Sequence, residues 1–279
     1  MSGGRHFSAS HFSRSRLGGA SGHSTSRLTS TTLRVATYNI HKGVRGMGPN
    51  KRLEIHNLGL GVEALDADLV FLQEVRRFNQ RDARRFERTW FGWPDQPQAD
   101  FLAPEGYEVA YRTNAYTRDG EHGNALLSRW PLGDVGHHDV SDHRFEQRGL
   151  LHVPVRWRGM QVHTIVVHLG LIHGSRLRQI EKLTRYIDQH VPPESPVVVA
   201  GDFNDWGERL DSGMGVAGLQ RAHAPKGGRE LTYPSRVPVF ALDRVYTRGL
   251  KCLSTFVPRG SAWARMSDHL PLVVELEPA

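Results

Sequence analysis

Several apolar segments of this 279-residue chain end in acids, amides or imidazoles, and this recurring pattern is its main chemical signal. The stretch "VVVAGDFND", which ends at Asp205, is typical, because a β-branched apolar run predicts a strand buried on both faces. A carboxylate at the end of such a strand costs free energy unless a partner compensates its charge. The pattern therefore predicts one shared pocket, and its candidate residues are Asn39, His41, Gln73, Glu74, His168, Asp202, Asn204, Asp205, Asp243, Asp268 and His269.

The donor atoms in this set are oxygens and imidazole nitrogens. Cys252 is the one cysteine of the chain, so an intrachain disulfide and a cysteine-based zinc cluster are both excluded. Oxygen-rich sets suit hard cations, and the sequence therefore predicts Mg²⁺ or Mn²⁺ as the cofactor. The cysteine usage fits a reducing compartment, and we expect a cytoplasmic protein.

The elements that must position these residues are mostly strands. The segment "SRLRQIEKLTRYIDQHV" predicts the clearest helix, with Leu177, Ile180, Leu183, Ile187 and Val191 on its apolar face. Many central strands follow one another directly, which favours two packed sheets with outer helices. The expected strands are "LRVATYNI", "ADLVFLQEV", "YEVAYRT", "NALLS", "GLLHVPVRW", "MQVHTIVVHL", "PVVVAGDFND", "FALDRVYT", "LKCLSTFV" and "LPLVVELE".

Composition divides the chain into a tail and one domain. Residues 1–32 are rich in Ser, Gly, Arg and His and hold no apolar block, so we expect a disordered basic tail. Residues 33–279 are expected to form one domain, and no segment is apolar enough to predict a transmembrane helix. The formal net charge is +7, and removing the four arginines of the tail leaves +3. Net charge is therefore a weak argument for a nucleic-acid partner. We also expect the protein to be a monomer.

The order of the polar motifs resembles that of the endonuclease/exonuclease/phosphatase superfamily, the DNase I-like fold. The resemblance covers Leu33 to Glu277 and implies an α/β (α+β) domain, a four-layer αββα sandwich that hydrolyses phosphoesters with a divalent metal. It rests on "TYNIHKG", "LQEV", "HGNALLSRWPL", "VVHLGL", "GDFND", "LDRVY" and "SDHLPLVVEL", of which "GDFN" and "SDHLP" are the most specific.

The resemblance assigns the metal side of the site to three residues. Glu74 takes the place of a direct metal ligand, and Asn39 stands where the family has a metal-site amide or acid. Asp268 completes the metal side, directly or through water.

The resemblance also assigns the phosphate side. His269 contacts the scissile phosphate, and Asp243 orients its imidazole. Asp202 and Asn204 lie on the side of the attacking water and of a phosphate oxygen, and His168 contacts the phosphate from the opposite wall. An anion beside two histidines favours their charged forms.

Each of these residues taken singly also fits a structural role, such as a turn cap for Asn39 or a surface ion pair for Glu74. The set is informative jointly, because independent structural roles would not reproduce the order of one family. The expected partner is a phosphodiester, with nucleic acid as the first substrate and a phospholipid or small phosphate ester as the alternative. A non-catalytic phosphate-binding module is the third hypothesis. Glu121 stands where members acting on abasic DNA have tyrosine, which argues against that repair activity.

Overall fold

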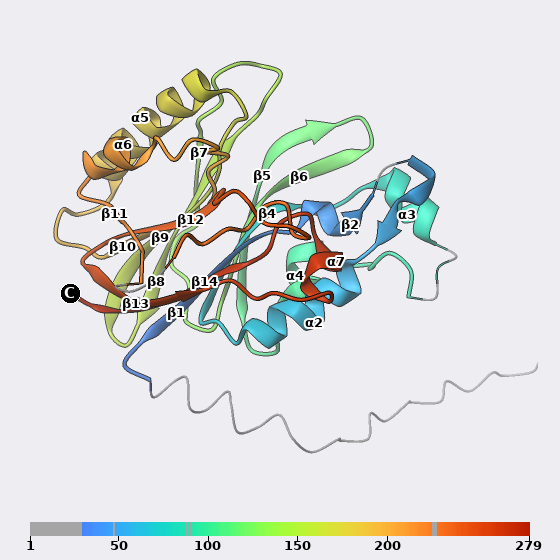
Figure 1. Cartoon of the computed structure of the whole chain (residues 1–279), viewed down its shortest axis with the longest axis horizontal. Helices are drawn as coiled ribbons and strands as arrows, with labels where there is room; N and C mark the ends of the chain where they lie inside the picture. Colours follow the sequence, from blue (N-terminus) through green and yellow to red (C-terminus); the bar gives the residue numbers. More distant parts are fainter. Residues whose placement is uncertain (1–29, 47, 88, 90, 225–227) are drawn as a thin grey trace, which may run out of the picture. The chain divides into compact units, whose positions relative to one another are not determined.

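The computed structural model describes residues 30–46, 48–87, 89, 91–224 and 228–279, and the predicted tail lies almost entirely outside them. A compact unit spans Thr31–Ala279. Within it, two six-stranded sheets face each other and helices cover their outer faces, as the predicted αββα sandwich requires (Figure 1).

The first sheet has the order β13-β14-β1-β4-β6-β5. β4 pairs parallel to β1, and β14 pairs antiparallel to it. The C-terminal ends of β1 and β4 and the N-terminal end of β14 therefore lie at the same end of this sheet. The strand bounds are β13 Leu250–Phe256, β14 Leu272–Pro278, β1 Leu33–Asn39, β4 Leu69–Val75, β6 Gly120–Ser128 and β5 Glu108–Thr117.

The second sheet has the order β11-β12-β10-β9-β8-β7. β9 and β10 run parallel to each other, and β8 and β12 run antiparallel to them. The C-terminal ends of β9 and β10 and the N-terminal ends of β8 and β12 therefore lie at the same end of this sheet. The strand bounds are β11 Gln220–Arg221, β12 Asp243–Arg248, β10 Val197–Asp202, β9 Met160–His168, β8 Gly149–Trp157 and β7 Gly136–Asp139.

Helices and short ribbons complete the outer layers. A small two-stranded ribbon pairs β2 Val44–Arg45 with β3 Arg52–Leu53. The helices of the described residues are α2 Ile55–Leu65, α3 Gln80–Phe86, α4 Gln98–Leu102, α5 His173–His190, α6 Asp211–Gly215 and α7 Trp263–Met266, with 3-10 turns η1 His41–Gly43 and η2 Gly48–Asn50. None of these helices has the length and apolarity that a bilayer crossing requires.

The core has three parts that match the layers. Side chains such as Phe71 and Val198 pack between the two sheets, whereas Val199 lies on the opposite face of β10 among residues of α5. A third cluster joins α2 to the outer face of the first sheet. The prediction that "VVVA" is buried on both faces is therefore confirmed. Of the expected apolar face of α5, Leu177 is the exception, because its side chain is 48% exposed.

Candidate active site

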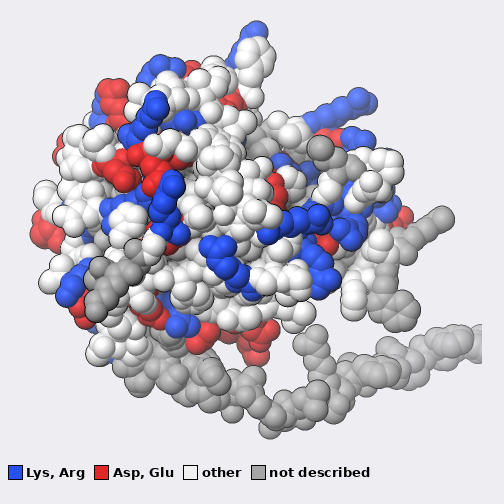
Figure 2. All heavy atoms as spheres, viewed as in Figure 1, with Lys and Arg blue, Asp and Glu red and all other residues white. Residues whose placement is uncertain are grey.

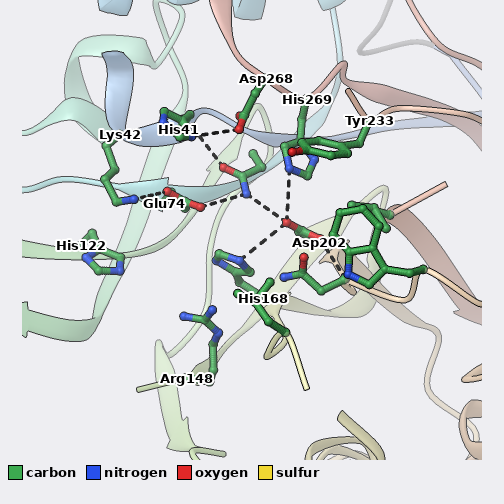
Figure 3. Close-up of a pocket in the computed structure, with 15 residues that line it drawn as sticks. His41, Lys42, Glu74, His122, Arg148, His168, Asp202, Tyr233, Asp268 and His269 are labelled. Carbon is green, nitrogen blue, oxygen red and sulfur yellow. Dashed lines mark hydrogen bonds and ion pairs between the residues drawn. The ribbon is translucent and has the colours of Figure 1, made fainter. Parts of the chain in front are cut away.

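A polar pocket opens where these ends of the two sheets lie together (Figure 3). Strand register explains this convergence. Asp202 pairs with His168 of the parallel strand β9 and with Asp243 of the antiparallel strand β12. The described residues that line the pocket are Asn39, His41, Lys42, Glu74, His122, Arg148, His168, Leu171, Asp202, Asn204, Trp206, Tyr233, Leu242, Asp268 and His269.

The Asp202 carboxylate lies at the centre of this pocket. Its Oδ2 accepts a 3.0 Å hydrogen bond from Nδ2 of Asn39, and its Oδ1 accepts one of 2.9 Å from the backbone N–H of Asn204. Nε2 of His168 and Nε2 of His269 each lie 3.6 Å from Oδ2, on opposite sides in Figure 3. Burial raises the pKa of Asp202, although the two imidazoles act in the opposite direction.

His269 is held from behind by a second carboxylate. Its Nδ1 lies 2.8 Å from Oδ2 of Asp243, so its Nε2 faces the pocket. Burial disfavours the charged imidazole, but the negative charges of Asp243, Asp202 and Asp268 outweigh burial and raise the pKa of His269 to about 10. His269 is therefore an imidazolium at neutral pH.

His168 has the opposite electrostatic character. Burial and the positive charge of Arg148 lower the pKa of His168 to about 4, despite the nearby Asp202 and Glu74. The expectation of two charged histidines applies to a pocket that holds phosphate. Without that anion the two imidazoles differ, and the imidazole on the Arg148 side is neutral.

The acids of the first sheet lie across Asn39 from Asp202. Glu74 has a backbone φ of +57° at an irregularity in the pairing of β4 with β6, and such a bulge redirects a side chain. Its Oε1 accepts a 3.3 Å hydrogen bond from Nδ2 of Asn39, and Nζ of Lys42 lies 2.5 Å from its Oε2. Burial opposes ionisation of Glu74, but Lys42 and His168 outweigh it and hold the pKa of this carboxyl well below its usual range.

Asp268 forms the second acidic position of this wall. Its Oδ2 lies 3.2 Å from Nδ1 of His41. Burial opposes ionisation here too, but the hydrogen bond from His41 and the charges of His269 and His41 lower the pKa of Asp268. Glu74 and Asp268 are therefore both anions, with Nζ of Lys42 beside the first and Nδ1 of His41 beside the second.

These donors fit a hard cation. The described part of the chain contains no group of three or more His, Cys, Asp or Glu side chains arranged as a metal cage. Mg²⁺ usually keeps several waters and binds one or two carboxylates, so Glu74 and Asp268, with the amide oxygen of Asn39, form a donor set of the right chemistry. The ionised state of both acids supports this fit.

Two residues of the predicted set turn away from the pocket. Asp205 is buried beside Arg244, and its Oδ2 accepts hydrogen bonds from Nη1 of Arg244 and from the backbone N–H groups of Arg209 and Leu210. Gln73 points into the first sheet and hydrogen-bonds Thr37. The eight residues with assigned roles all lie in the pocket or, in the case of Asp243, directly behind it.

Sequence reasoning missed Lys42, Arg148 and Tyr233. Lys42 follows His41 in a turn, and both have positive φ angles that the sequence does not reveal. Arg148 precedes β8, and the antiparallel pairing of β8 with β9 brings this strand start to the end of β9. A basic residue before a predicted strand was the available signal. Tyr233 lies beside His269, with ring centroids 4.9 Å apart and ring planes tilted by 50°, on a segment outside the named helices and strands.

Comparisons with known proteins agree with this architecture. The Endonuclease/Exonuclease/phosphatase family model matches residues 36–269. YbhP of Escherichia coli K12 is 34% identical over 250 residues, which are 88% of this chain and 96% of YbhP. An endonuclease/exonuclease/phosphatase structure from Beutenbergia cavernae has a TM-score of 0.68 at 22% identity, over 90% of this chain and 72% of that one.

A further structural neighbour carries a named activity. The mannosyl-6-phosphatase of Bacteroides thetaiotaomicron has a TM-score of 0.62 at 16% identity, over 88% of this chain and 99% of that protein. At such identities the likeness concerns the fold. The family model spans most of the chain, and the matched residues include those that line the pocket. This chain therefore belongs to the endonuclease/exonuclease/phosphatase family, whose members are generally hydrolases of phosphoester bonds.

Proposed function

We propose that this protein is a divalent-metal-dependent phosphodiesterase that hydrolyses phosphoester bonds in the Asp202 pocket. The observation that carries the proposal is the position of Asp202 between two imidazoles, with Asn39 linking it to Glu74. A candidate base, a fixed imidazolium and an acid wall for a cation thus meet in one pocket. Separate structural roles for these residues would not require them to face the same space.

The cationic side chains of the pocket suit a phosphate group. His269 carries a positive charge at neutral pH, and Arg148 and Lys42 approach from other walls (Figure 3). Non-bridging phosphate oxygens that lie among these groups gain charge-assisted hydrogen bonds. Because Asp243 fixes the imidazole ring, His269 stabilises the charge that grows in the transition state without having to reorient.

Asp202 is the candidate general base. Among the described residues no Lys or Arg forms an ion pair with Asp202, and burial raises the pKa of its carboxyl, which makes this carboxylate a stronger base than an exposed one. In-line displacement places the attacking water opposite the leaving group. Asp202 and the neutral His168 orient this water, and Asn204 contributes to the same wall.

The metal side belongs to Glu74, Asp268 and Asn39, and Mg²⁺ or Mn²⁺ are the proposed ions. When bound, such an ion neutralises phosphate charge and stabilises the leaving oxygen. Lys42 and His41 compensate the two acids in this structure, so they have to release these carboxylates for the ion.

The substrate is a finer question than the reaction. Nucleic acid remains the first prediction from the sequence, with phospholipids and small phosphate esters as alternatives that use the same chemistry. A cytoplasmic, monomeric enzyme with a dispensable tail over residues 1–32 also remains a prediction. A module that only binds phosphate is disfavoured, because it has no need of the paired Asp243 and His269.

The reaction is tested with bis-p-nitrophenyl phosphate, a generic soluble diester, in the presence of Mg²⁺ or Mn²⁺. We expect release of p-nitrophenolate that EDTA abolishes and that Glu74→Gln strongly reduces while circular dichroism stays unchanged. Activity that is equal with and without EDTA would contradict the role of the metal. A panel of DNA, RNA, phospholipids and sugar phosphates then ranks the substrate classes.

A further inference from the structure

The mouth of the pocket carries exposed apolar side chains that folding does not explain. They lie on loops at the pocket end of the second sheet and form two ridges. The Phe145 ridge comprises Phe145, Leu171 and Ile172, and the Trp206 ridge comprises Trp206, Val237 and Val239. Their exposed fractions are 82%, 60% and 57% in the first ridge and 40%, 69% and 50% in the second.

Contacts fix the Phe145 ridge beside the pocket. Glu146, which follows Phe145, accepts a 3.0 Å hydrogen bond from the backbone N–H of Leu171 and is also bonded to Arg148. Leu171 and Arg148 both line the pocket. The loop that precedes β8 and the loop that precedes α5 are thereby joined at the mouth.

Contacts fix the Trp206 ridge in the same way. The indole of Trp206 packs edge-to-face against Tyr233 and Phe240, with ring centroids 5.5 Å and 4.9 Å away. Backbone hydrogen bonds tie Val237 and Val239 to the same turn, at Pro234 and Tyr233. Tyr233 contacts His269, so this ridge continues directly from the phosphate side of the pocket.

An exposed apolar residue is ordinary when it stands singly, but apolar side chains gathered around a functional pocket indicate a binding surface. Each ridge also carries an exposed arginine at its apolar tip, Arg144 before Phe145 and Arg236 before Val237. Neither guanidinium forms an ion pair with another described residue, and that of Arg144 lies over the Phe145 ring, 4.7 Å from its centroid. Nearby acids are compensated within the protein, as Asp142 is by Arg178.

The combination of apolar tips and unpaired arginines fits a membrane interface. Apolar side chains insert at the boundary between head groups and acyl chains, and arginines there attract anionic lipids. Single-stranded nucleic acid would call for aromatic stacking platforms. Four of the six ridge residues are aliphatic, which favours acyl chains over bases.

We propose that the two ridges dock this protein on an anionic phospholipid surface, so that the head-group phosphate of one lipid reaches the Asp202 pocket. The second half of this statement rests on the proposed phosphoesterase function, whereas docking does not. In Figure 2, Lys and Arg side chains also gather over the part of the molecule that carries α3 and β2 in Figure 1. Arg81 and Arg85 of α3 belong to this basic flank, which adjoins the active-site pocket at Lys42 and adds attraction to an anionic surface.

The test is cosedimentation of the full chain with vesicles of phosphatidylcholine alone or mixed with phosphatidylglycerol. The chain offers matched residues for the variants. Val237→Ser alters the Trp206 ridge, and Val216→Ser alters an 82% exposed valine that lines no part of the pocket. Leu171→Ser and Leu60→Ser form a second pair, since Leu60 is 67% exposed on α2.

We expect binding to the phosphatidylglycerol vesicles that salt weakens, and roughly tenfold weaker partitioning for each ridge variant, because each loses one inserted apolar side chain. The two controls should bind as the wild type does. Absence of sedimentation, or equal losses in ridge and control variants, would overturn the proposal. Ridge-dependent binding of a single-stranded oligonucleotide without vesicle binding would overturn it in favour of nucleic acid.

These measurements test the docking proposal and the proposed phosphoesterase function independently. Val237→Ser should retain the wild-type rate on bis-p-nitrophenyl phosphate, because this soluble diester needs no interface. Lost vesicle binding with intact diester hydrolysis would reject docking and keep the proposed function. Vesicle binding by a protein that hydrolyses no diester would keep docking and reject the proposed function.

Discussion

The motif "GDFND" contributes two buried carboxylates, Asp202 and Asp205, and the surroundings of these two carboxylates differ. Asp205 lies against Arg244, whose guanidinium is fully buried and also hydrogen-bonds the backbone oxygens of Asp205 and Ala241. Asp202 forms no ion pair with an arginine in the described part of the chain, and two imidazoles lie 3.6 Å from its Oδ2. Arg244 and Asp243 are neighbours on β12, yet Arg244 pairs with Asp205, whereas Asp243 holds the imidazole of His269 that faces Asp202.

The difference shows how a fold separates stability from reactivity. Arginine keeps its charge at any physiological pH, so the Asp205–Arg244 pair is a fixed structural element. Beside Asp202 the imidazole of His168 is neutral, and burial raises the pKa of the Asp202 carboxyl, so Asp202 keeps its capacity to accept a proton. We therefore expect changes near Asp202 to act on the rate and changes near Arg244 to act on the free energy of unfolding.

The largest effect is expected for Asp202→Asn. Losing a general base lowers kcat for bis-p-nitrophenyl phosphate by roughly 10²–10⁴-fold. The free energy of unfolding should not fall, because burial raises the pKa of Asp202 and a neutral amide lacks the cost of a buried charge. Steady-state rates and urea titrations measure both quantities, and a stable variant with the wild-type rate would refute the assignment.

Arg244→Met tests the other half of the comparison. Removing the guanidinium leaves Asp205 buried without its cation, which should lower the free energy of unfolding by about 3–5 kcal/mol. The double variant Asp205→Asn/Arg244→Met should recover part of this loss, because the unpaired charge is gone. A large fall in kcat of the folded protein without a loss of stability would break the comparison.

A buried histidine outside the pocket sharpens the comparison. His152 hydrogen-bonds His163 and Tyr186 beneath α5, and burial lowers its pKa from 6.5 to about 4, with the charges of His163 and His190 acting in the same direction. Below pH 6.5 the unfolded chain binds a proton that the folded His152 does not. The free energy of unfolding should therefore fall by about 2 kcal/mol from pH 7 to pH 5.

The control for this pH effect is His152→Gln, whose side chain is polar but does not titrate. Urea titrations at several pH values should show a smaller fall for the variant, and the rate at neutral pH should stay unchanged. An identical pH dependence in the two proteins would show that other groups control it.

The smallest effect is expected for Lys42→Met. The ammonium of Lys42 competes with a divalent ion for Glu74, and a partly exposed ion pair of this kind contributes little. Removing it should tighten Mn²⁺ binding about two- to fivefold, as measured by electron paramagnetic resonance. Lys51→Met, which removes the ion pair with Asp82, should leave Mn²⁺ affinity unchanged. Weaker Mn²⁺ binding by Lys42→Met would contradict the competition.

The layers of the fold could be predicted because strands are recognisable from short stretches of sequence. Most of the pocket could be predicted because polar residues end these strands in the order of a known family. The separation of Asp202 from Asp205 could not, since it depends on the positive φ of Asn204 and on which side Arg244 leaves β12. Lys42 and Arg148 were missed for a similar reason. Their positions follow from a left-handed turn and from antiparallel register, which pair residues far apart in sequence.

The central claim is that the Asp202 pocket hydrolyses phosphoesters with the help of His269. The most direct measurement is the rate of p-nitrophenolate release from bis-p-nitrophenyl phosphate by the wild type and by His269→Ala, with Mg²⁺ or Mn²⁺ present. We predict turnover by the wild type and a loss of roughly 10²-fold or more in the variant. Equal rates for the two proteins, or no turnover by the wild type with either ion, would contradict the claim.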